Sequence, residues 1–506
     1  MDLSTETFTP QSALPGQPSA VSKLRVVVYG WIALLTAALI VYATTIGFVW
    51  DEGFHAVAAQ LIAHGKRPYL DFCFPQTPLN AYWNSLWIRL FGENWRVLHV
   101  VAVLEIGGAM FLAAQWILTR FPVARWRWAA AIVAVSFIGL HTEVVQFGPI
   151  AQAYAIAMFL LTAAFRVAVL WPERPRSATL SFATAVLSAG AAASTLLTAP
   201  AAAVFFGWFC LKATGVRRLR NAVAFVIGAV IPFAPVLWLF ARAPKIVFFN
   251  IVQYQAIYRR YDWPGATPHD IDVLSAWLAD GQSLLLVLLS AYALYFLVRK
   301  SGWAAEIRSQ YYLCACAAAA LTIYISTAHP TFARYFIVAV PLVAIVAAVG
   351  MYAFASRMTD SHRPLWPTAI LVAVLLLAYG RAIFDERDAA TWGQYERITK
   401  IVHDVTPKNG IIYADELVYF LLKQAPPSGM EFSYSHKVQL SAAEEKLYHI
   451  VSDKELDKLV AAGHFATVET CSDDRTDEMH LDQVFAHKKD VQDCSIFWGW
   501  KQGPNK

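Results

Sequence analysis

Long apolar runs joined by short polar connections make up the first three quarters of the chain. A helix that crosses the hydrocarbon core of a bilayer needs about 20 mostly apolar residues. The runs therefore predict an all-α, polytopic bundle of eleven membrane-spanning helices, four of them short. The expected ranges are 26–49, 97–118, 128–141, 149–170, 178–194, 200–214, 221–241, 282–299, 310–328, 335–356 and 365–384. The division between 178 and 211 stays open, because the polar turn from Ser194 to Pro200 could also bend a single helix.

The basic residues between these runs predict the orientation of the bundle. Cytoplasmic connections of membrane proteins are enriched in Lys and Arg. Counted from a cytoplasmic N-terminus, every connection on that side is short and basic, whereas the connections 141–148 and 195–199 on the other side hold no Lys or Arg. The pattern places residues 1–25 in the cytoplasm as a disordered tail. It places 50–96, 242–281 and 385–506 outside.

The composition changes near residue 384. Of 506 residues, 58% are hydrophobic and 15% are charged, against roughly 45–50% and about 25% in soluble domains. Yet 21 of the 36 acidic residues follow residue 384. The sequence thus predicts a membrane domain, 26–384, followed by a small α/β extracytoplasmic domain, 385–506. Cys471 and Cys494 would both face an oxidising compartment there and could form a disulfide, a point that the sequence leaves undecided.

Two short amphipathic helices are expected in the first outer loop, residues 50–96. Apolar residues recur every three or four positions from 54 to 62, and Gly65 is a good stop. A second such helix begins after Thr77-Pro78 and ends at Gly92, with Trp and Tyr suited to the headgroup level on one face. Both helices would lie on the membrane surface, on either side of loop 68–76. That loop is a natural site for a substrate that is itself a lipid.

Two carboxylates and an imidazole, Asp51, Glu52 and His55, follow the first apolar run within one helical turn. Asp51 stands where a helix N-cap belongs, and capping alone would explain an acid at this position. A carboxylate in such a cluster, at the edge of low-dielectric lipid, is also suited to general-base catalysis. Asp51 is therefore the leading candidate for a catalytic residue.

The residues around this cluster resemble the first outer loop of the membrane glycosyltransferases of GT-C fold. The similarity lies in Trp-Asp-Glu-Gly-Phe-His at 50–55, Gly-Lys-Arg-Pro-Tyr-Leu-Asp at 65–71 and Pro-Gln-Thr-Pro-Leu-Asn-Ala-Tyr-Trp at 75–83. The chain looks most like the bacterial relatives of protein O-mannosyltransferase and of the lipid A aminoarabinose transferase, in glycosyltransferase families 39 and 83. The resemblance implies that Asp51 is the catalytic base and that Glu52 completes an acidic pair with it.

A second similarity, His-Pro-Thr-Phe-Ala-Arg-Tyr-Phe-Ile-Val-Ala-Val-Pro at 329–341, resembles the Arg-Tyr segment of that family. An Arg at this depth can bind a lipid phosphate in bidentate fashion; the alternative is an interface anchor made of Arg334 and Tyr335. The resemblance also implies that Glu143 positions substrate or a divalent ion, whereas its place in a very short outer turn favours an exposed carboxylate without such a role. Arg259, among aromatic residues, could hold phosphate or sugar, with membrane anchoring as an equal alternative. The expected substrate-binding residues are His55, Lys66, Arg67, Tyr69, Asp71, Glu143, Arg259, Arg334 and Tyr335.

The reaction implied by the resemblance is transfer of a monosaccharide, with inversion, from a polyprenyl-phosphate donor to a glycan, lipid or protein acceptor. It would take place on the outer face of a bacterial inner membrane. No metal ligand is assigned and no cofactor is required, although a divalent cation would be compatible with the site. A nucleotide site is not expected, because the chain has no Gly-rich phosphate loop. Nucleic acid is not an expected partner, because no Lys/Arg block accompanies the net charge of +5.

Two alternatives remain at this stage: a transporter or flippase for a lipid-linked sugar, and a non-enzymatic membrane scaffold. A transporter needs polar residues along a path through the bundle. Glu105 is the clear case of an intramembrane charge, and its predicted role is hydrogen bonding to a neighbouring helix. The polar cluster lies instead at one rim of the membrane, which favours chemistry at the surface.

Overall fold

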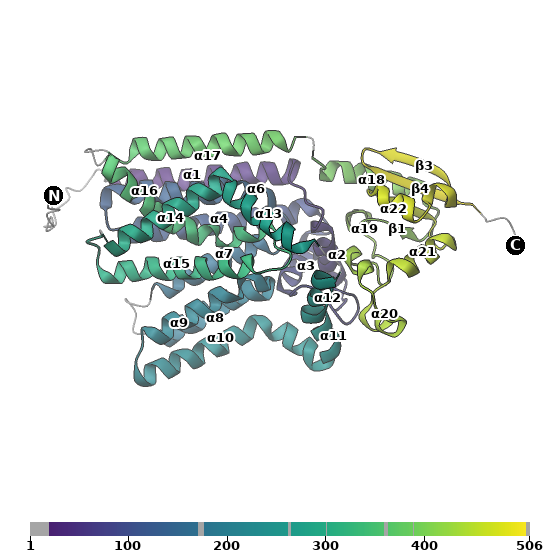
Figure 1. The fold of residues 1–506 in the computed structure, drawn as a ribbon, viewed down its shortest axis with the longest axis horizontal. Helices are drawn as coiled ribbons and strands as arrows, with labels where there is room; N and C mark the ends of the chain where they lie inside the picture. The colour runs from purple at the N-terminus through teal and green to yellow at the C-terminus, as the bar shows by residue number, and fades with distance from the viewer. Residues whose placement is uncertain are drawn as a thin grey trace.

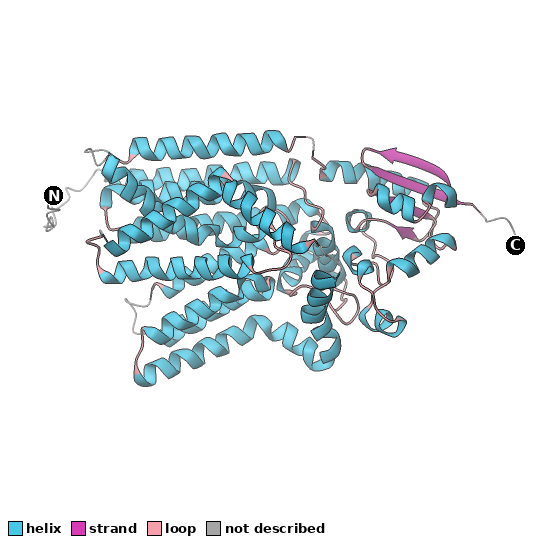
Figure 2. Ribbon diagram, viewed as in Figure 1, coloured by secondary structure: helices cyan, strands magenta, loops and turns pink. Residues whose placement is uncertain are grey.

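The computed structural model describes residues 20–170, 177–261, 265–299, 301–358, 363–387 and 389–501. Its helices form a bundle whose axes run roughly along the longest dimension of the molecule, and a smaller domain that contains a sheet lies at one end (Figures 1 and 2). The tail expected over 1–25 lies outside the described residues up to residue 19, and a helix already begins at Ala20.

A helix occupies each of the eleven predicted ranges. These helices are α1 Ala20–Thr45, α4 Trp95–Arg120, α5 Arg127–Leu140, α7 Tyr154–Ala168, α8 Ser177–Ser194, α9 Ala199–Leu211, α10 Gly215–Arg242, α14 Gly281–Arg299, α15 Ala305–Ser326, α16 Val340–Met358 and α17 Leu365–Asp385. The ambiguous run is divided in two, because the short turn η3 (Leu196–Thr198) separates α8 from α9. In the described residues, seven helices, counting η5–α16 as one, are long and apolar enough to cross a bilayer. The full count of eleven spans stays a prediction.

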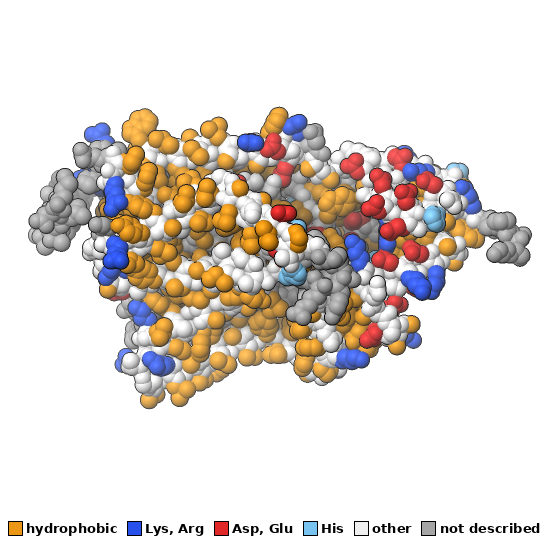
Figure 3. Space-filling model, viewed as in Figure 1, with side chains coloured by type: hydrophobic (Ala, Val, Ile, Leu, Met, Phe, Trp, Pro, Cys, Tyr) orange, Lys and Arg blue, Asp and Glu red, His pale blue; other side chains and the backbone are white. Residues whose placement is uncertain are grey.

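The outer surface of the bundle is apolar. Ile370 and Leu377 of α17 are 63% and 75% exposed, and α10 exposes Val226, Ile227 and Ile231. Hydrophobic side chains cover the bundle in Figure 3, basic side chains gather at the end remote from the small domain, and acidic side chains gather on that domain. Soluble monomeric proteins rarely expose a continuous apolar surface that covers most of a domain. The bundle is therefore suited to a lipid environment.

Small residues allow the helices to approach closely. A Cβ atom added at Gly350 of α16 would lie 1.9 Å from the carbonyl oxygen of Leu289 in α14. One added at Gly228 of α10 would lie 2.5 Å from the carbonyl oxygen of Phe182 in α8. Close backbone packing of this kind stabilises helix pairs in membranes, where apolar burial gives little driving force. Glu105 of α4 accepts a hydrogen bond from the Trp83 indole at 2.7 Å, which confirms its predicted role.

Two short helices, α2 (Glu52–Ala63) and α3 (Leu79–Phe91), form the first loop. The outer side of α3 exposes Leu86 and Leu90. Its inner side is polar, and Asn80 and Asn84 each donate a hydrogen bond to the carbonyl oxygen of Ala151, at 3.0 and 2.8 Å. An apolar outer side and a polar inner side fit the helix that is predicted to lie at the membrane surface. In contrast, α2 is buried from Glu52 to Ile62, because α3 and the C-terminal domain both pack against it.

Shorter elements complete the connections of the bundle. They are η1 Ala124–Trp126, α6 Thr142–Phe147, α11 Pro244–Phe248, the π-helical turn η4 Phe249–Gln253, α12 Tyr254–Tyr261, α13 Ala266–Ala279 and η5 Ala333–Ala339. The segment from α11 to α13 corresponds to the second large loop expected outside the membrane. It lies at the same end of the bundle as α2 and α3 (Figure 1).

The C-terminal residues form the small α/β domain that the sequence predicts. Its elements are α18 Trp392–Val405, β1 Ile412–Tyr413, α19 Glu416–Leu422, η6 Ser433–Lys437, α20 Ala442–Tyr448, α21 Asp453–Ala461, β2 Thr467–Thr470, α22 Asp473–Glu478, α23 Leu481–Val484, β3 Phe485–Val491 and β4 Cys494–Trp500. The strand order is β1-β2-β4-β3, with β1 and β2 parallel and the other pairs antiparallel. The domain packs on the bundle through α19, where a Cβ at Gly53 of α2 would lie 3.0 Å from Cβ of Glu416.

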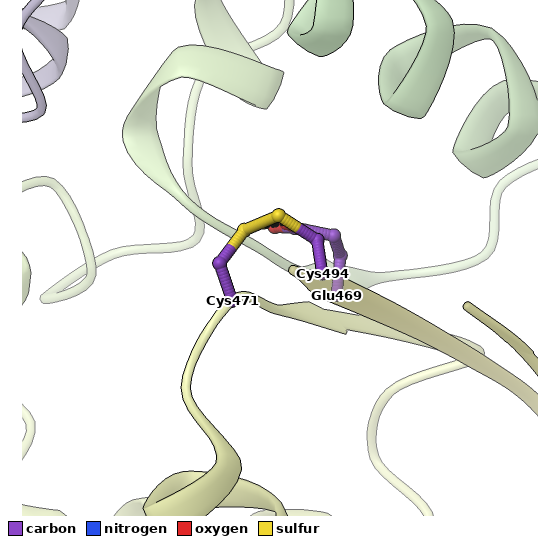
Figure 4. A group of neighbouring side chains, drawn as sticks. All are labelled: Glu469, Cys471 and Cys494. Carbon is purple, nitrogen blue, oxygen red and sulfur yellow. Dashed lines mark hydrogen bonds between the residues drawn. A yellow bond between two sulfur atoms is a disulfide. The ribbon is translucent and has the colours of Figure 1, made fainter. Parts of the chain in front are cut away.

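A disulfide joins Cys471, just after β2, to Cys494 at the start of β4. It answers the question that the sequence left open. Glu469 lies beside the bridge (Figure 4), and the Tyr395 hydroxyl is 3.3 Å from the sulfur of Cys471. The crosslink therefore joins the ends of the two central strands, β2 and β4, next to α18, the helix that leads the chain out of the bundle.

Candidate active site

A cavity of about 260 Å³ opens at the end of the bundle where the C-terminal domain sits. Its walls come from α2, the loop before α3, the turn before α7, the α8–α9 connection, η4 and η5. The polar residues that line it are Asp51, His55, Gln76, Thr77, Gln152, Tyr154, Thr195, Gln255, Tyr324, Arg334 and Tyr335. Four of the predicted site residues, Asp51, His55, Arg334 and Tyr335, thus share one hollow.

Asp51 occupies the N-cap position of α2, yet its carboxylate makes no capping hydrogen bond. Its Oδ2 atom accepts a hydrogen bond from the Arg334 guanidinium at 2.5 Å. Its Oδ1 atom accepts one from the Tyr434 hydroxyl at 2.6 Å. Both bonds hold the carboxylate at the cavity wall, where 17% of the side chain stays exposed. Capping therefore does not explain this residue.

Arg334 is the second residue of the 3-10 segment η5, which continues into α16. Besides its ion pair with Asp51, its guanidinium lies 4.5 Å from the centre of the Phe332 ring and 6.0 Å from that of Tyr335. Stacking against aromatic rings restricts a guanidinium that would otherwise rotate freely. Arg334 is thus a fixed positive charge in the cavity, with 22% of its side chain exposed.

Glu52 does not line the cavity, although it was grouped with Asp51 as catalytic. It is fully buried, and its carboxylate accepts from the Ala151 amide at 2.9 Å and from the Trp392 indole at 3.3 Å. His99 Nε2 lies 2.6 Å from it, while His99 Nδ1 lies 2.6 Å from the carbonyl oxygen of Ala43. Since a carbonyl can only accept, Nδ1 carries a proton, and Glu52 shares a second proton with Nε2. Glu52 ties α2 to α1, α4, the turn before α7 and α18.

Replacing Glu52 with Ala should destabilise the protein by about 3–5 kcal/mol, because removal of one partner leaves buried polar groups uncompensated. The matched control is Glu396→Ala, whose ion pair with Arg96 is 41% and 47% exposed and should contribute about 0–1 kcal/mol. Thermal unfolding of the detergent-solubilised proteins compares the two. Equal melting temperatures for both variants would contradict the structural role given to Glu52.

His55 lies on α2 one turn after Asp51 and contributes to the cavity wall. Burial lowers the pKa of His55 to about 4, so the ring is neutral at physiological pH. Its Nδ1 atom is buried without a hydrogen-bond partner in the described residues. A buried polar atom of this kind normally has a partner. His55 is therefore free to bind a polar group of a molecule in the cavity.

The remaining loop residues predicted to bind substrate lie away from the cavity. Arg67 and Asp71 form an ion pair with each other at 2.7 Å, with the Arg67 side chain 53% exposed. Lys66 is exposed. Tyr69 is buried, and its hydroxyl donates to the carbonyl oxygen of Gln76 at 2.6 Å, which closes the loop on itself. These four residues shape the loop, and a substrate contact would require the loop to rearrange.

Glu143 lies in α6, close to the cavity but not on its wall. Burial raises the pKa of Glu143 to about 7, the neighbouring Asp280 adds to the rise, and Arg334 opposes it. Its Oε2 atom is buried without a hydrogen-bond partner in the part of the chain that the structure describes. Arg259 falls within α12, but its side chain lies outside the described residues.

Several site residues were not predicted. Tyr434 reaches Asp51 from η6 of the C-terminal domain, across 383 positions of sequence. Gln152, Thr195 and Gln255 add amide and hydroxyl groups from three separate segments. Thr195 lies in the expected outer connection 195–199, and Gln152 lies near the outer end of the expected helix 149–170; these positions were the available signal. Nothing in the sequence pointed to Tyr434.

Potential metal ligands lie close together among the described side chains of the C-terminal domain. They include one group of three potential ligands at mutual binding distance, Glu469, Cys471 and Cys494. Both sulfurs of this group belong to the disulfide (Figure 4). Thiolates are the ligand form of cysteine, so this group is not a metal centre in the bridged protein.

Comparison with known proteins identifies the fold. No protein-family model and no curated protein sequence matches the chain. Its structure is similar to the crystal structure of ArnT, the lipid A aminoarabinose transferase, from Cupriavidus metallidurans in the apo state. The TM-score is 0.65 at 14% identity, over 94% of this chain and 98% of that one. The same enzyme bound to undecaprenyl phosphate gives 0.64 at 14% identity, over 92% and 98%.

An oligosaccharyltransferase from Archaeoglobus fulgidus, in complex with Zn and sulfate, is also similar. The TM-score is 0.50 at 13% identity, over 87% of this chain and 67% of that one. Both similar proteins are glycosyltransferases of GT-C fold. The fold predicted from the first loop is thereby confirmed, and the chain is an integral membrane protein of this architecture. At these identities the similarity concerns the fold alone, so the activity has to be argued from the site.

Proposed function

We propose that the protein transfers a monosaccharide from a polyprenyl-phosphate carrier to an acceptor hydroxyl or amine outside the cytoplasm. One observation carries the proposal: a carboxylate and a guanidinium, Asp51 and Arg334, face the same cavity at the rim of an apolar bundle. Group transfer from a lipid phosphate needs a base for the incoming nucleophile and a cation for the departing phosphate. These two side chains supply both within one site.

The ion pair between Asp51 and Arg334 is suited to a donor that carries phosphate. Without substrate, each side chain neutralises the other at a position where both are largely buried. The phosphodiester of the donor offers Arg334 two oxygens that share one negative charge, and a second negative charge develops on them as the bond to the sugar breaks. Arg334 can then turn to the donor, which leaves Asp51 with a free oxygen for the acceptor.

The chemical step follows from this arrangement. The acceptor oxygen or nitrogen attacks the anomeric carbon and forms the new bond, while the bond from that carbon to the phosphate oxygen breaks. The electron pair leaves with the phosphate, and the acceptor proton passes to Asp51. Attack opposite to the leaving group inverts the anomeric configuration. Arg334 stabilises the negative charge that develops on the phosphate.

The neutral His55 and the side-chain amides of the cavity are suited to binding the sugar rather than the phosphate. Its unpartnered Nδ1 atom and the side chains of Gln152 and Gln255 line the cavity with groups that bind hydroxyls. A sugar offers hydroxyls that both donate and accept hydrogen bonds. We therefore assign these residues to the sugar of the donor, and the lipid tail to the apolar surroundings of the bundle.

The two alternatives from the sequence analysis make different demands on the molecule. A flippase needs a polar path through the bundle, whereas Glu105, the clear intramembrane charge, is engaged with Trp83. A scaffold has no need for a charge pair held in a cavity. The site at the rim thus favours an enzyme over both.

Mass spectrometry of cell-envelope glycans, lipids and proteins tests the proposal. Strains with and without the gene should differ by the mass of one sugar on one class of acceptor, and re-introduction of the gene should restore it. Re-introduction of the Asp51→Asn variant should not. Identical envelope masses in the two strains, with the donor lipid present in both, would overturn the proposed function.

A further inference from the structure

The C-terminal domain contains a second hollow, a polar cleft of about 600 Å³. Its walls belong to the segment β1–α19, to η6, to the end of β2 and to α22. Trp50 of the membrane domain completes the wall, and its side chain is 44% exposed. This hollow is separate from the membrane cavity, and none of the steps derived above uses it.

The cleft lies next to the membrane cavity at Trp50 and Asp51. Trp50 lines the cleft and the next residue, Asp51, lines the cavity, so consecutive residues face the two hollows. Tyr434 also lines the cleft, and its hydroxyl donates to Oδ1 of Asp51 at 2.6 Å. An acceptor hydroxyl must donate to Asp51 in the same way before it reacts. Tyr434 thus occupies the position from which a molecule bound in the cleft reaches Asp51, the proposed base.

A buried, unpartnered nitrogen in the wall of the cleft is available to bind a polar group. His436 is 3% exposed and lines the cleft. Its Nδ1 atom lies 2.5 Å from the carbonyl oxygen of Val451 and must carry the proton, while Nε2 has no hydrogen-bond partner in the described residues. Burial lowers the pKa of His436, which keeps the ring neutral. Nε2 is therefore an acceptor that awaits an O–H or N–H group.

The other side chains of the cleft define the class of ligand. Arg475 is held by Asp453 at 2.7 Å, and Lys437 and Asp474 are exposed at the rim. Acidic residues outnumber basic ones on the walls: Asp415, Asp453, Glu469, Asp474 and Glu478 against Lys437 and Arg475. Burial raises the pKa of Asp415 and Glu469, so the negative charge of the walls comes mainly from Asp453, Asp474 and Glu478. It still exceeds the positive charge of Lys437 and Arg475, and this small excess disfavours phosphate and carboxylate groups. Donors, acceptors and the partly exposed ring of Trp50 together suit a molecule with many hydroxyls and apolar C–H faces.

We propose that this cleft binds the acceptor, and that the acceptor is a glycan whose sugars at this site carry no phosphate or carboxylate. The inference rests on the proposed function and narrows its acceptor from glycan, lipid or protein to glycan. The chain of sugars lies along the cleft, with one hydroxyl donating to Nε2 of His436. The reacting hydroxyl extends past Trp50, displaces the hydroxyl of Tyr434 and donates to Asp51.

The test separates acceptor binding from donor chemistry. Full-length protein in proteoliposomes receives the donor lipid fraction of a strain that lacks the gene, and the envelope glycan fraction of that strain as acceptor. Transfer is measured against acceptor concentration. Release of free sugar without acceptor, where water takes its place, reports donor chemistry alone.

Two adjacent substitutions form a matched pair. Asp473 and Asp474 are both exposed on α22, but only Asp474 lines the cleft. Asp474→Trp should fill the cleft and raise the acceptor KM about tenfold or more, the factor expected for the loss of a buried hydrogen bond or its equivalent in packing. The rate of donor hydrolysis should stay within about twofold of the wild-type rate. Asp473→Trp should change neither rate.

Substitutions of His436 test the acceptor nitrogen. His436→Asn keeps a donor for the carbonyl of Val451 but removes the group at Nε2, so it should raise the acceptor KM about tenfold. His436→Gln places an oxygen near the Nε2 position and should recover part of the loss. His403→Ala, at a histidine that is 72% exposed on α18, is the control. Periodate, which cleaves the vicinal diols of sugars, should abolish the activity of the acceptor fraction.

The experiments distinguish a failure of this inference from a failure of the proposed function. A wild-type protein that neither transfers nor hydrolyses would overturn the proposed function and this inference with it. If both Asp474→Trp and His436→Asn keep the acceptor KM of the wild type, the inference is wrong while the proposed function stands. The same holds if transfer and donor hydrolysis fall in parallel in the folded variants. An acceptor fraction that survives periodate would point to a protein or lipid acceptor and would also overturn it.

Discussion

Replacement of Asp51 by Asn should lower the rate of sugar transfer about 10²–10⁴-fold, the range that a positioned general base contributes. Asn has the size of Asp, and its carbonyl oxygen can still accept from the Tyr434 hydroxyl, which now bonds Oδ1 at 2.6 Å. What disappears is the ability to take a proton from the acceptor. The fold should persist, so thermal unfolding should change little while the rate collapses.

The control for Asp51 is Asp385→Asn at the end of α17, where the side chain is 63% exposed. Its rate should equal that of the wild type. Transfer is measured with the donor lipid and acceptor fractions of a strain that lacks the gene. A rate for Asp51→Asn within about threefold of the wild type would exclude Asp51 as the base.

Replacement of Arg334 by Gln should lower the rate about 10²–10³-fold, the cost of removing one donor that stabilises a developing anion. Arg334→Lys should retain more activity than Arg334→Gln, because it keeps the positive charge, but less than the wild type, because an ammonium cannot form the bidentate contact. Both variants are compared in the same transfer assay as the Asp51 variants.

Arg381→Gln, at an arginine that is 85% exposed on α17, is the matched control and should leave the rate unchanged. Because Arg334 and Asp51 share an ion pair, the double variant should lose less than the product of the two single losses. Equal rates for Arg334→Gln and Arg381→Gln would exclude a role for Arg334 at the leaving phosphate.

The helices of the bundle could be predicted from the sequence because the signal is local. About 20 apolar residues suffice to indicate a helix in lipid, and every predicted range contains one. The start of α7 was placed too early, at 149 instead of Tyr154. The residues before it form a turn whose Ala151 binds Glu52, Asn80 and Asn84 through its backbone. Those partners lie 67 or more positions away, so no local pattern could reveal the turn.

The burial of α2 was not predictable for a related reason. Its apolar residues recur with helical spacing, which indicates that one face of the helix is buried but does not say what covers the opposite face. The second face is covered by α19 of the C-terminal domain, more than 350 residues later. A helix that looks amphipathic in isolation thus becomes buried from Glu52 to Ile62. Whether it lies at the level of the membrane surface stays a prediction.

The centre of the site was predicted in part. Asp51 and Arg334 are 283 positions apart, and the family resemblance, rather than any physical pattern, linked them. His99 looked like any histidine in an apolar helix until its two ring nitrogens were placed between Ala43 and Glu52. Contacts of this kind depend on the packing of distant helices. The sequence indicated the acidic cluster of the first loop as a candidate site, but the residues that contact this cluster could not be predicted from it.

The fate of the bond between the anomeric carbon and the phosphate of the donor tests the central claim most directly. The purified protein is reconstituted in liposomes that contain a polyprenyl-phosphate sugar labelled in the sugar, with the acceptor glycan fraction on the side of the C-terminal domain. The account predicts that the bond is cleaved, that the label passes to the acceptor with inverted configuration, and that free polyprenyl phosphate accumulates. Intact labelled donor that moves to the opposite leaflet, or stays where it was, would contradict it.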